Sequence, residues 1–132
     1  RLKQTQAAPV APVIDANAVL AARAEVNQIH IAPELEHYIV ALVAGTRKLD
    51  TAAPEVARYI QVGASPRATL AIAHAAQALA YLRGRDFVSP DDILDIAPDC
   101  LRHRLIASVS ARVEKISTEH VVQCLLAAVP TP

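Results

Sequence analysis

Two helix starts in this sequence combine serine and proline with charged residues of opposite sign. Ser65-Pro66 is followed by Arg67, whereas Ser89-Pro90 is followed by Asp91 and Asp92. The first amides of a helix have no partner within it, and the peptide dipoles are aligned, so a helix N-terminus attracts anions. The two aspartates therefore complement their helix start without a ligand. Arg67 opposes the field of its own helix, at a cost of about 0.3–1 kcal/mol.

The placement of Arg67 admits two interpretations. Exposed helix amides and a guanidinium can both contact the oxygens of a phosphate, which makes Arg67 a candidate phosphate ligand. Alternatively, Arg67 extends into solvent or pairs with a carboxylate such as Glu55, with no ligand involved. The local pattern alone favours the second interpretation, because the dipole cost at an exposed site is small.

Other side chains that do chemistry in proteins are scattered along the chain. Cys100 and Cys124 are neither close together nor dense enough for a disulfide scaffold, which favours a reducing compartment such as the cytoplasm. The histidines show no spacing typical of metal ligands, so we predict no bound metal. They are His30, His37, His74, His103 and His120. No nucleophile, base and orienting acid form a recognisable set, and we expect no catalysis by this chain alone.

The composition indicates that helices position these residues. Hydrophobic residues make up 53% of the 132-residue chain and aromatic residues only 3%, an alanine- and leucine-rich mixture that favours closely packed helices. The 13 basic and 13 acidic side chains cancel, so no overall field would attract nucleic acid or a membrane surface. No apolar run approaches the ~18 residues of a membrane span.

A local basic patch is the basis of a rival function, nucleic-acid binding. Its members would be Arg83, Arg85, Arg102, His103 and Arg104. Aromatic residues for base stacking are almost absent, and nearby carboxylates would neutralise the patch. These carboxylates are Asp86, Asp91, Asp92 and Asp95. A mixed-charge solvated face or a subunit interface is the stronger interpretation.

Apolar periodicity and capping residues predict an all-α fold, a small bundle of four to five helices. The expected helices cover 15–27, 33–45, 66–84, 90–103 (broken at Pro98) and 118–129. In the second helix we predict that Leu35, Tyr38, Ile39, Leu42 and Val43 form the buried stripe. In the third, the residues expected to be available for burial are Leu70, Ile72, Ala76, Leu79 and Leu82.

The remaining segments are predicted to be irregular or extended. Residues 49–57, with Pro54, are expected to form a loop. Residues 58–62 alternate in polarity and 104–109 also suit an extended conformation, so a short pairing between them would fit the bundle.

Three segments in order resemble the C-terminal lid of the MoxR family of AAA+ ATPases, which is related to the ATPase subunit of magnesium chelatase. They are IAPELEHYIVALVAGTRK, GASPRATLAIAHAAQALAYLRGRDFVSPDDI and LRHRL, within about residues 26–105. The resemblance implies a helical lid that follows an α/β nucleotide-binding domain. It also implies that Arg67, in the GASPRA motif, is the sensor-2 arginine that approaches the γ-phosphate of ATP.

The resemblance also implies an organisation for a longer parent protein. Residues 1–14 would be a linker from a missing upstream ATPase domain, with a hinge within 9–15; residues 15–129 would be the lid and 130–132 a tail. ATP and Mg²⁺ would bind the intact parent and neither is expected on the isolated fragment, because this chain has no Gly-x-x-x-x-Gly-Lys-[Ser/Thr] loop.

The implied partners are the upstream domain, neighbouring subunits of a ring, usually a hexamer, and von Willebrand factor A-type proteins. The implied role is chaperone-like remodelling or maturation of protein complexes. The cytoplasmic location remains an expectation from the two cysteines. The alternative is a helical module that binds nucleic acid or protein without a nucleotide role.

Overall fold

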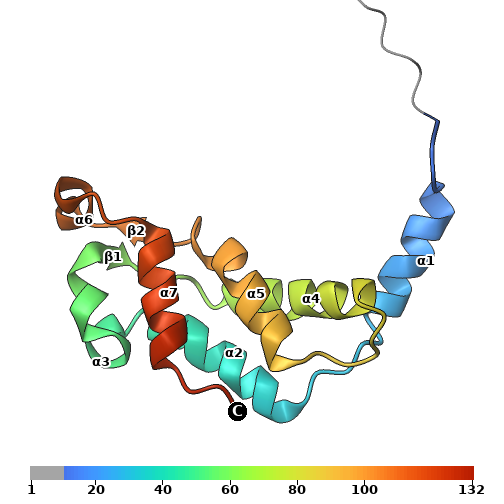
Figure 1. Cartoon of the computed structure of the whole chain (residues 1–132), viewed down its shortest axis with the longest axis horizontal. Helices are drawn as coiled ribbons and strands as arrows, with labels where there is room; N and C mark the ends of the chain where they lie inside the picture. The colour runs from blue at the N-terminus through green and yellow to red at the C-terminus, as the bar shows by residue number, and fades with distance from the viewer. Residues whose placement is uncertain (1–10) are drawn as a thin grey trace, which may run out of the picture.

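A computed structural model describes residues 11–132 and confirms the all-α fold (Figure 1). The elements are α1 (Ala16–Val26), α2 (Pro33–Gly45), α3 (Leu49–Ala52), the 3-10 helix η1 (Pro54–Tyr59), β1 (Ile60–Val62), α4 (Arg67–Leu82), α5 (Pro90–Leu101), β2 (Ile106–Ala107), α6 (Val109–Glu114) and α7 (Thr118–Ala128). Residues 11–14 form neither helix nor strand, and the rest of the predicted linker, 1–10, lies outside the described residues.

The main core lies between α2, α4, α5 and α7 (Figure 1). The predicted stripe of α2 is confirmed, since all five of its side chains are buried. The prediction for α4 was wrong at Leu70 and Leu82, which are 61% and 80% exposed. The buried stripe of α4 instead consists of Ala68, Ile72, Ala76 and Ala80. Two residues along a helix rotate a side chain by about 200°, so this alanine-rich stripe turns both leucines outward.

A second apolar cluster orders the segment that was predicted to be a loop. Residues 49–57 form α3 and most of η1, with Pro54 in the first turn of the 3-10 helix. The buried side chains of this cluster are Leu49, Ala53, Val56, Tyr59, Ala111, Val121 and Leu125. The loop prediction was therefore wrong because contacts with α6 and α7, distant in sequence, stabilise these two short helices.

The predicted pairing of extended segments is confirmed in a shorter form. β1 and β2 are antiparallel, with Ile60 opposite Ala107 and Val62 opposite Ile106. The chain after β2 turns into α6, which was not predicted. Ser108 begins this helix, because its hydroxyl accepts a hydrogen bond from the Ala111 amide.

Pro98 does not break α5, contrary to the prediction. The helix continues to Leu101, and the Arg102 amide still donates to the Pro98 carbonyl at 3.0 Å. Pro98 and Leu101 are both buried, so their packing offsets the hydrogen bond that proline cannot donate. The last helix agrees with its prediction: Ser117 caps α7 through the His120 amide, and four of its side chains are buried.

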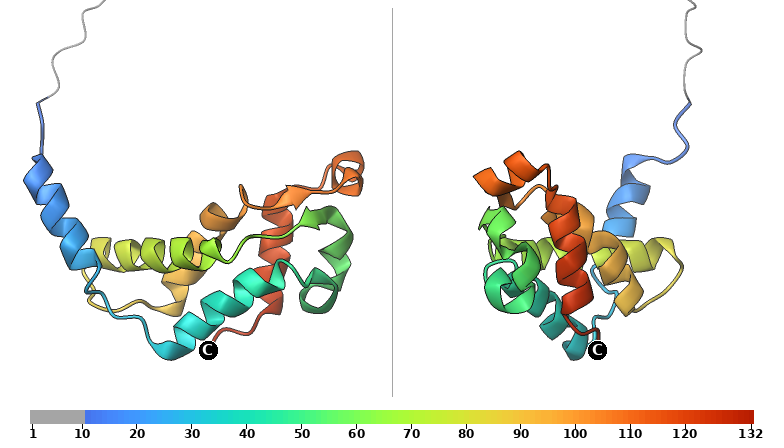
Figure 2. Two further views of the ribbon diagram at one scale, coloured as in Figure 1. Left: turned by 180° about the vertical axis from the view of Figure 1, so that it is seen from behind. Right: turned by 60° about the vertical axis from the view of Figure 1, so that its left-hand side comes forward.

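The first helix also forms where it was predicted. The Asp15 carboxylate accepts a hydrogen bond from the Ala18 amide at 2.7 Å and so caps α1. Unlike the other long helices, α1 extends away from the body of the molecule (Figure 2). Within residues 11–132, no helix is both long enough and apolar enough to span a lipid bilayer.

Candidate functional site

The candidate site is the first turn of α4, where Arg67 is the first helical residue. The sequence pattern predicted Pro66 in that position, and the helix begins one residue later. Ser65 still acts at this end, because its hydroxyl accepts a hydrogen bond from the Arg67 amide at 3.2 Å. Backbone bonds from Ala68 to Ser65 and from Thr69 to Pro66 complete the turn.

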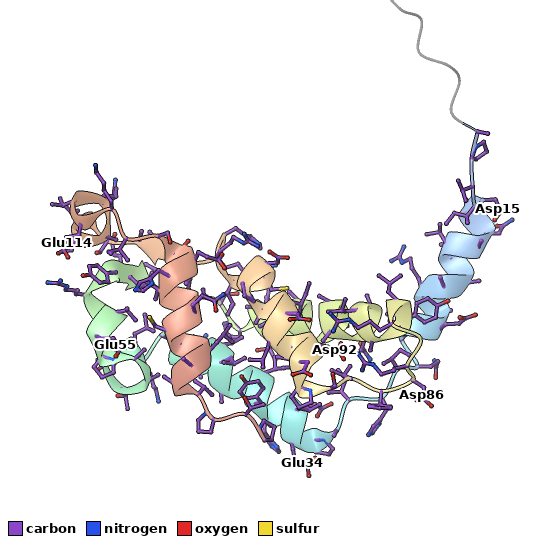
Figure 3. All side chains as sticks on the ribbon, in the orientation of Figure 1. Asp15, Glu34, Glu55, Asp86, Asp92 and Glu114 are labelled. Atoms are coloured by element: carbon purple, nitrogen blue, oxygen red, sulfur yellow. The ribbon has the colours of Figure 1, made fainter. Side chains whose placement is uncertain are left out.

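The Arg67 side chain is exposed at this electropositive end of α4. Among residues 11–132, no carboxylate forms an ion pair with its guanidinium. Glu55, the partner that the alternative interpretation suggested, lies on η1, exposed and without a salt bridge to Arg67 (Figure 3). The described part of the chain therefore leaves the charge of Arg67 available to an external anion.

The loop that precedes Arg67 is fixed to the C-terminal end of α2. The buried hydroxyl of Thr46 accepts a hydrogen bond from the Ala64 amide at 2.9 Å and donates one to the Val43 carbonyl at 2.7 Å. From the next residue, the guanidinium of Arg47 donates to the Ala64 carbonyl at 3.1 Å. Hydrogen bonds thus hold both backbone groups of Ala64. They fix the position of the first turn of α4 and therefore the position of Arg67.

Close backbone contact also requires glycine in this loop. A Cβ at Gly63 would lie 2.3 Å from the Thr46 carbonyl oxygen and 2.8 Å from Cγ of Arg47. Thr46, Arg47 and Gly63 were not predicted to be positioning residues. Gly63 is the first residue of the GASPRA motif, but nothing in the sequence indicates its tertiary contact with Thr46 and Arg47.

Thr46 provides a direct test of this attachment. We expect Thr46→Val to lower the free energy of unfolding by about 2 kcal/mol, because the change keeps the shape but leaves the buried Ala64 amide without an acceptor. Thr46→Ser, which keeps the hydroxyl, should retain most of the stability. Urea denaturation of the three proteins measures the difference, and equal loss in both variants would contradict the role of the hydrogen bond.

The arginines of the proposed basic patch are engaged in internal contacts. Arg85 binds Asp92 through two hydrogen bonds of 2.8 and 2.6 Å, and Arg83 contacts Asp92 at 2.8 Å and Asp95 at 2.6 Å. Arg102 pairs with Asp99 and lies 3.5 Å from Glu119. These ion pairs remove much of the charge on which nucleic-acid binding would depend.

Asp92, which is labelled in Figure 3 and lies in the first turn of α5, is the centre of this network. Its side chain is fully buried, while those of Arg83 and Arg85 are 40% and 26% exposed. Burial alone would raise the pKa of Asp92, but hydrogen bonds from Arg85, from Ser89 and from Arg83 outweigh burial and hold the pKa well below its ordinary value. Asp92 also closes a capping box with Ser89, so the network joins the end of α4 to the start of α5.

Within residues 11–132, no group of three or more His, Cys, Asp or Glu side chains is arranged so that it could hold a metal ion. Cys100 and Cys124 are free thiols, both half-buried.

Comparisons with known proteins agree with this fold. A family model described as the AAA lid domain matches residues 52–124. Chaperone MoxR1 of Mycobacterium tuberculosis is 42% identical over 107 residues, which cover 80% of this chain and 28% of that protein. Protein MoxR of Methylorubrum extorquens is 34% identical over 84 residues, covering 60% of this chain and 24% of that protein.

A solved structure also matches this fold. The crystal structure of a candidate ATPase from Cytophaga hutchinsonii superposes with a TM-score of 0.83 at 40% identity, covering 86% of this chain and 35% of that one. Because the family model matches more than half of the residues, the chain belongs to the AAA lid domain family. The predicted resemblance to the lid of MoxR-family AAA+ proteins is confirmed. The chain spans only about a quarter to a third of the length of these proteins.

Proposed function

We propose that this chain is the C-terminal lid of a AAA+ ATPase and that Arg67 is its sensor-2 residue, which contacts the γ-phosphate of ATP. The observation that carries the proposal is the exposed guanidinium at the N-terminus of α4, without an ion-pair partner among residues 11–132. Amides and guanidinium at this end suit a phosphate oxygen. The family and the MoxR relatives support the assignment.

The residues present fit one edge of a nucleotide site. Arg67 would orient and neutralise the terminal phosphate, while the phosphate loop and the ligands of Mg²⁺ belong to the upstream α/β domain, because this sequence contains no such loop. ATP supplies the phosphoryl group that is transferred to water. The rigid attachment of the Ala64 backbone to α2 links Arg67 to the helical body, so a contact made at Arg67 moves the lid as a unit.

Nucleotide state would then control lid position. A ligand shifts a conformational balance only by its different free energies of interaction with the two states. ATP has the γ-phosphate that Arg67 would contact, and ADP lacks it. The lid would therefore close on ATP and release ADP. This motion would drive chaperone-like remodelling of protein complexes by a cytoplasmic ring, a hexamer, that works with von Willebrand factor A-type partners.

The domain limits follow from the same proposal. Residues 1–14 connect to the ATPase domain, 15–129 form the lid and 130–132 are a tail. The sequence of this chain contains no phosphate-loop motif, so we expect no ATP hydrolysis by the chain alone.

Arg67→Ala in the intact parent tests the function. We expect ATP turnover to fall at least ~10-fold, because removal of one preorganised charge at the reacting phosphate costs more than about 1.4 kcal/mol. Arg112→Ala is the matched control, since Arg112 is also exposed and helical but lies on α6. Unchanged turnover in Arg67→Ala would contradict the sensor-2 assignment.

A further inference from the structure

The first helix has little contact with the rest of the fold. No side chain of α1 is buried, and only Ala22 and Val26 are half-buried. In both views of Figure 2 the helix extends away from the body of the molecule. Large apolar side chains on α1 and on the residues just before it face solvent. They are Val13 (96% exposed), Ile14 (64%), Val19 (43%) and Leu20 (59%).

Firm attachment to the body begins only after α1 has ended. Ile29 is buried, and its carbonyl accepts a hydrogen bond from Nε2 of Gln77 on α4 at 2.7 Å. The His30 amide donates to the Asp86 carbonyl at 2.9 Å, and the Val88 amide donates to the His30 carbonyl at 2.9 Å. From Ile29 onward the chain is therefore held by both α4 and the α4–α5 connection.

The contact between α1 and α4 is open on two sides. A cleft of about 400 Å³ lies between the end of α1 and the α4–α5 connection, next to Glu25 and Asp86. A second, of about 440 Å³, lies between Arg23 and His74. One side-chain hydrogen bond crosses the junction, from the Tyr81 hydroxyl to the Glu25 carboxylate at 2.7 Å, and it is exposed. Such a contact positions α1 without locking it.

We propose that α1 docks on the α/β ATPase domain of the parent protein and that Asn27–Gln28 is the hinge between this unit and the lid. The inference rests on the proposed function. It revises the domain limits proposed above, because the lid would begin after α1 and not at residue 15. It also moves the hinge, which the sequence-based expectation placed within residues 9–15.

The exposed residues define the kind of surface that covers α1. Between Val13 and Leu20 the only charged residue is Asp15, whose carboxylate already caps the helix. An apolar partner surface therefore fits this segment. The exposed apolar side chains extend from α1 to residues 13 and 14, which precede it. We therefore place the partner surface at the N-terminal side of α1. MoxR1 is more than three times as long as the stretch matched here, which leaves ample chain for such a domain in a protein of this kind.

Hydrogen exchange on the 132-residue chain is the first test. A helix of 11 residues without buried side chains is marginal in water, so α1 amides should be at least about 100-fold less protected than those of residues 72–80 in α4. Deletion of residues 1–26 should leave the urea midpoint unchanged, whereas Ile29→Ala should lower it. Equal protection of α1 and α4, or destabilisation by the deletion, would overturn the proposal.

The second test uses the chain extended to include the upstream domain. There, protection of α1 should rise at least about 100-fold. Leu20→Asp should abolish that gain, and Leu82→Asp, a matched change at an exposed leucine of α4, should not. If the short chain instead dimerises through Leu20 and α1 stays unprotected in the longer protein, the partner is a second copy and the proposal is wrong.

These results are independent of the Arg67 experiment. If α1 stays unprotected while Arg67→Ala still slows ATP turnover, this inference fails and the proposed function stands. If α1 becomes protected while Arg67→Ala has normal turnover, docking to the upstream domain stands and the sensor-2 assignment fails.

Discussion

Asp92→Asn should lower the free energy of unfolding by about 3 kcal/mol, because it leaves two arginines facing a buried neutral amide. The amide cannot replace a carboxylate that accepts bonds from Arg83, from Arg85 and from the Ser89 amide and hydroxyl. The value lies at the low end of the range for broken buried ion pairs, since both guanidinium groups are partly solvated. Urea denaturation at neutral pH measures the loss.

Asp91→Asn is the matched control for this prediction. Asp91 is exposed in the same first turn of α5, so its charge contributes only the dipole effect of about 0.3–1 kcal/mol. Equal losses in the two variants would show that the network around Asp92 adds nothing beyond charge at a helix end.

The same carboxylate predicts how stability depends on pH. Because the pKa of Asp92 is lowered in the folded state, its contribution is fully present above the unfolded pKa of about 3.9. The contribution is lost as the pH falls through the lower folded value. The wild type should therefore lose more stability than Asp92→Asn when the pH falls below about 4, and the two curves should converge.

Asp92 shows how far local sequence reasoning extends. The Ser89-Pro90 start and its acidic turn were predicted correctly, since capping depends on neighbours within four residues. Neutralisation of the basic patch by nearby carboxylates was also predicted. The burial of Asp92 was not, because it depends on how α4 and α5 pack together.

The helices also differ in how well the sequence predicted their buried residues. The stripe of α2 was predicted because its large apolar residues coincide with the helical period. In α4 the prediction was right for Ile72 and Ala76 and wrong for Leu70 and Leu82. Small alanines occupy most of the buried stripe, so the size of a side chain did not indicate which face is buried. The loop prediction for residues 49–57 failed for a different reason: contacts with α6 and α7 stabilise the helices of this segment, and its own sequence does not reveal those contacts.

The candidate site was also only partly predictable. Arg67 stood out because its charge conflicts with its own helix, a local property that the sequence displays. The residues that position Arg67 act through contacts between segments 17 to 18 residues apart, such as the hydrogen bond from Ala64 to Thr46. Single-residue types at that separation carry no sign of their contact.

Gly63→Ala should have the largest effect on the candidate site itself. The new Cβ would lie 2.3 Å from the Thr46 carbonyl oxygen and 2.6 Å from its carbon, and both are backbone atoms that cannot rotate away. The loop must shift, which breaks the two hydrogen bonds that hold Ala64. We expect a loss of about 3 kcal/mol in the free energy of unfolding, at the upper end of overpacking costs, because one buried and one partly buried hydrogen bond are lost as well.

Gly84→Ala separates this steric effect from a conformational one. Gly84 has a φ of 71°, and no atom lies within 4 Å of the position that an added methyl group would take, so alanine there costs about 1 kcal/mol of backbone strain and no clash. If Arg67 has the proposed sensor-2 role, Gly63→Ala should also slow ATP turnover of the intact parent, because Arg67 follows four residues later. Gly84→Ala, at the far end of α4, should not. If Gly63→Ala is no more destabilising than Gly84→Ala, the loop before α4 is not held against α2. The attachment to α2 would then not fix the position of Arg67.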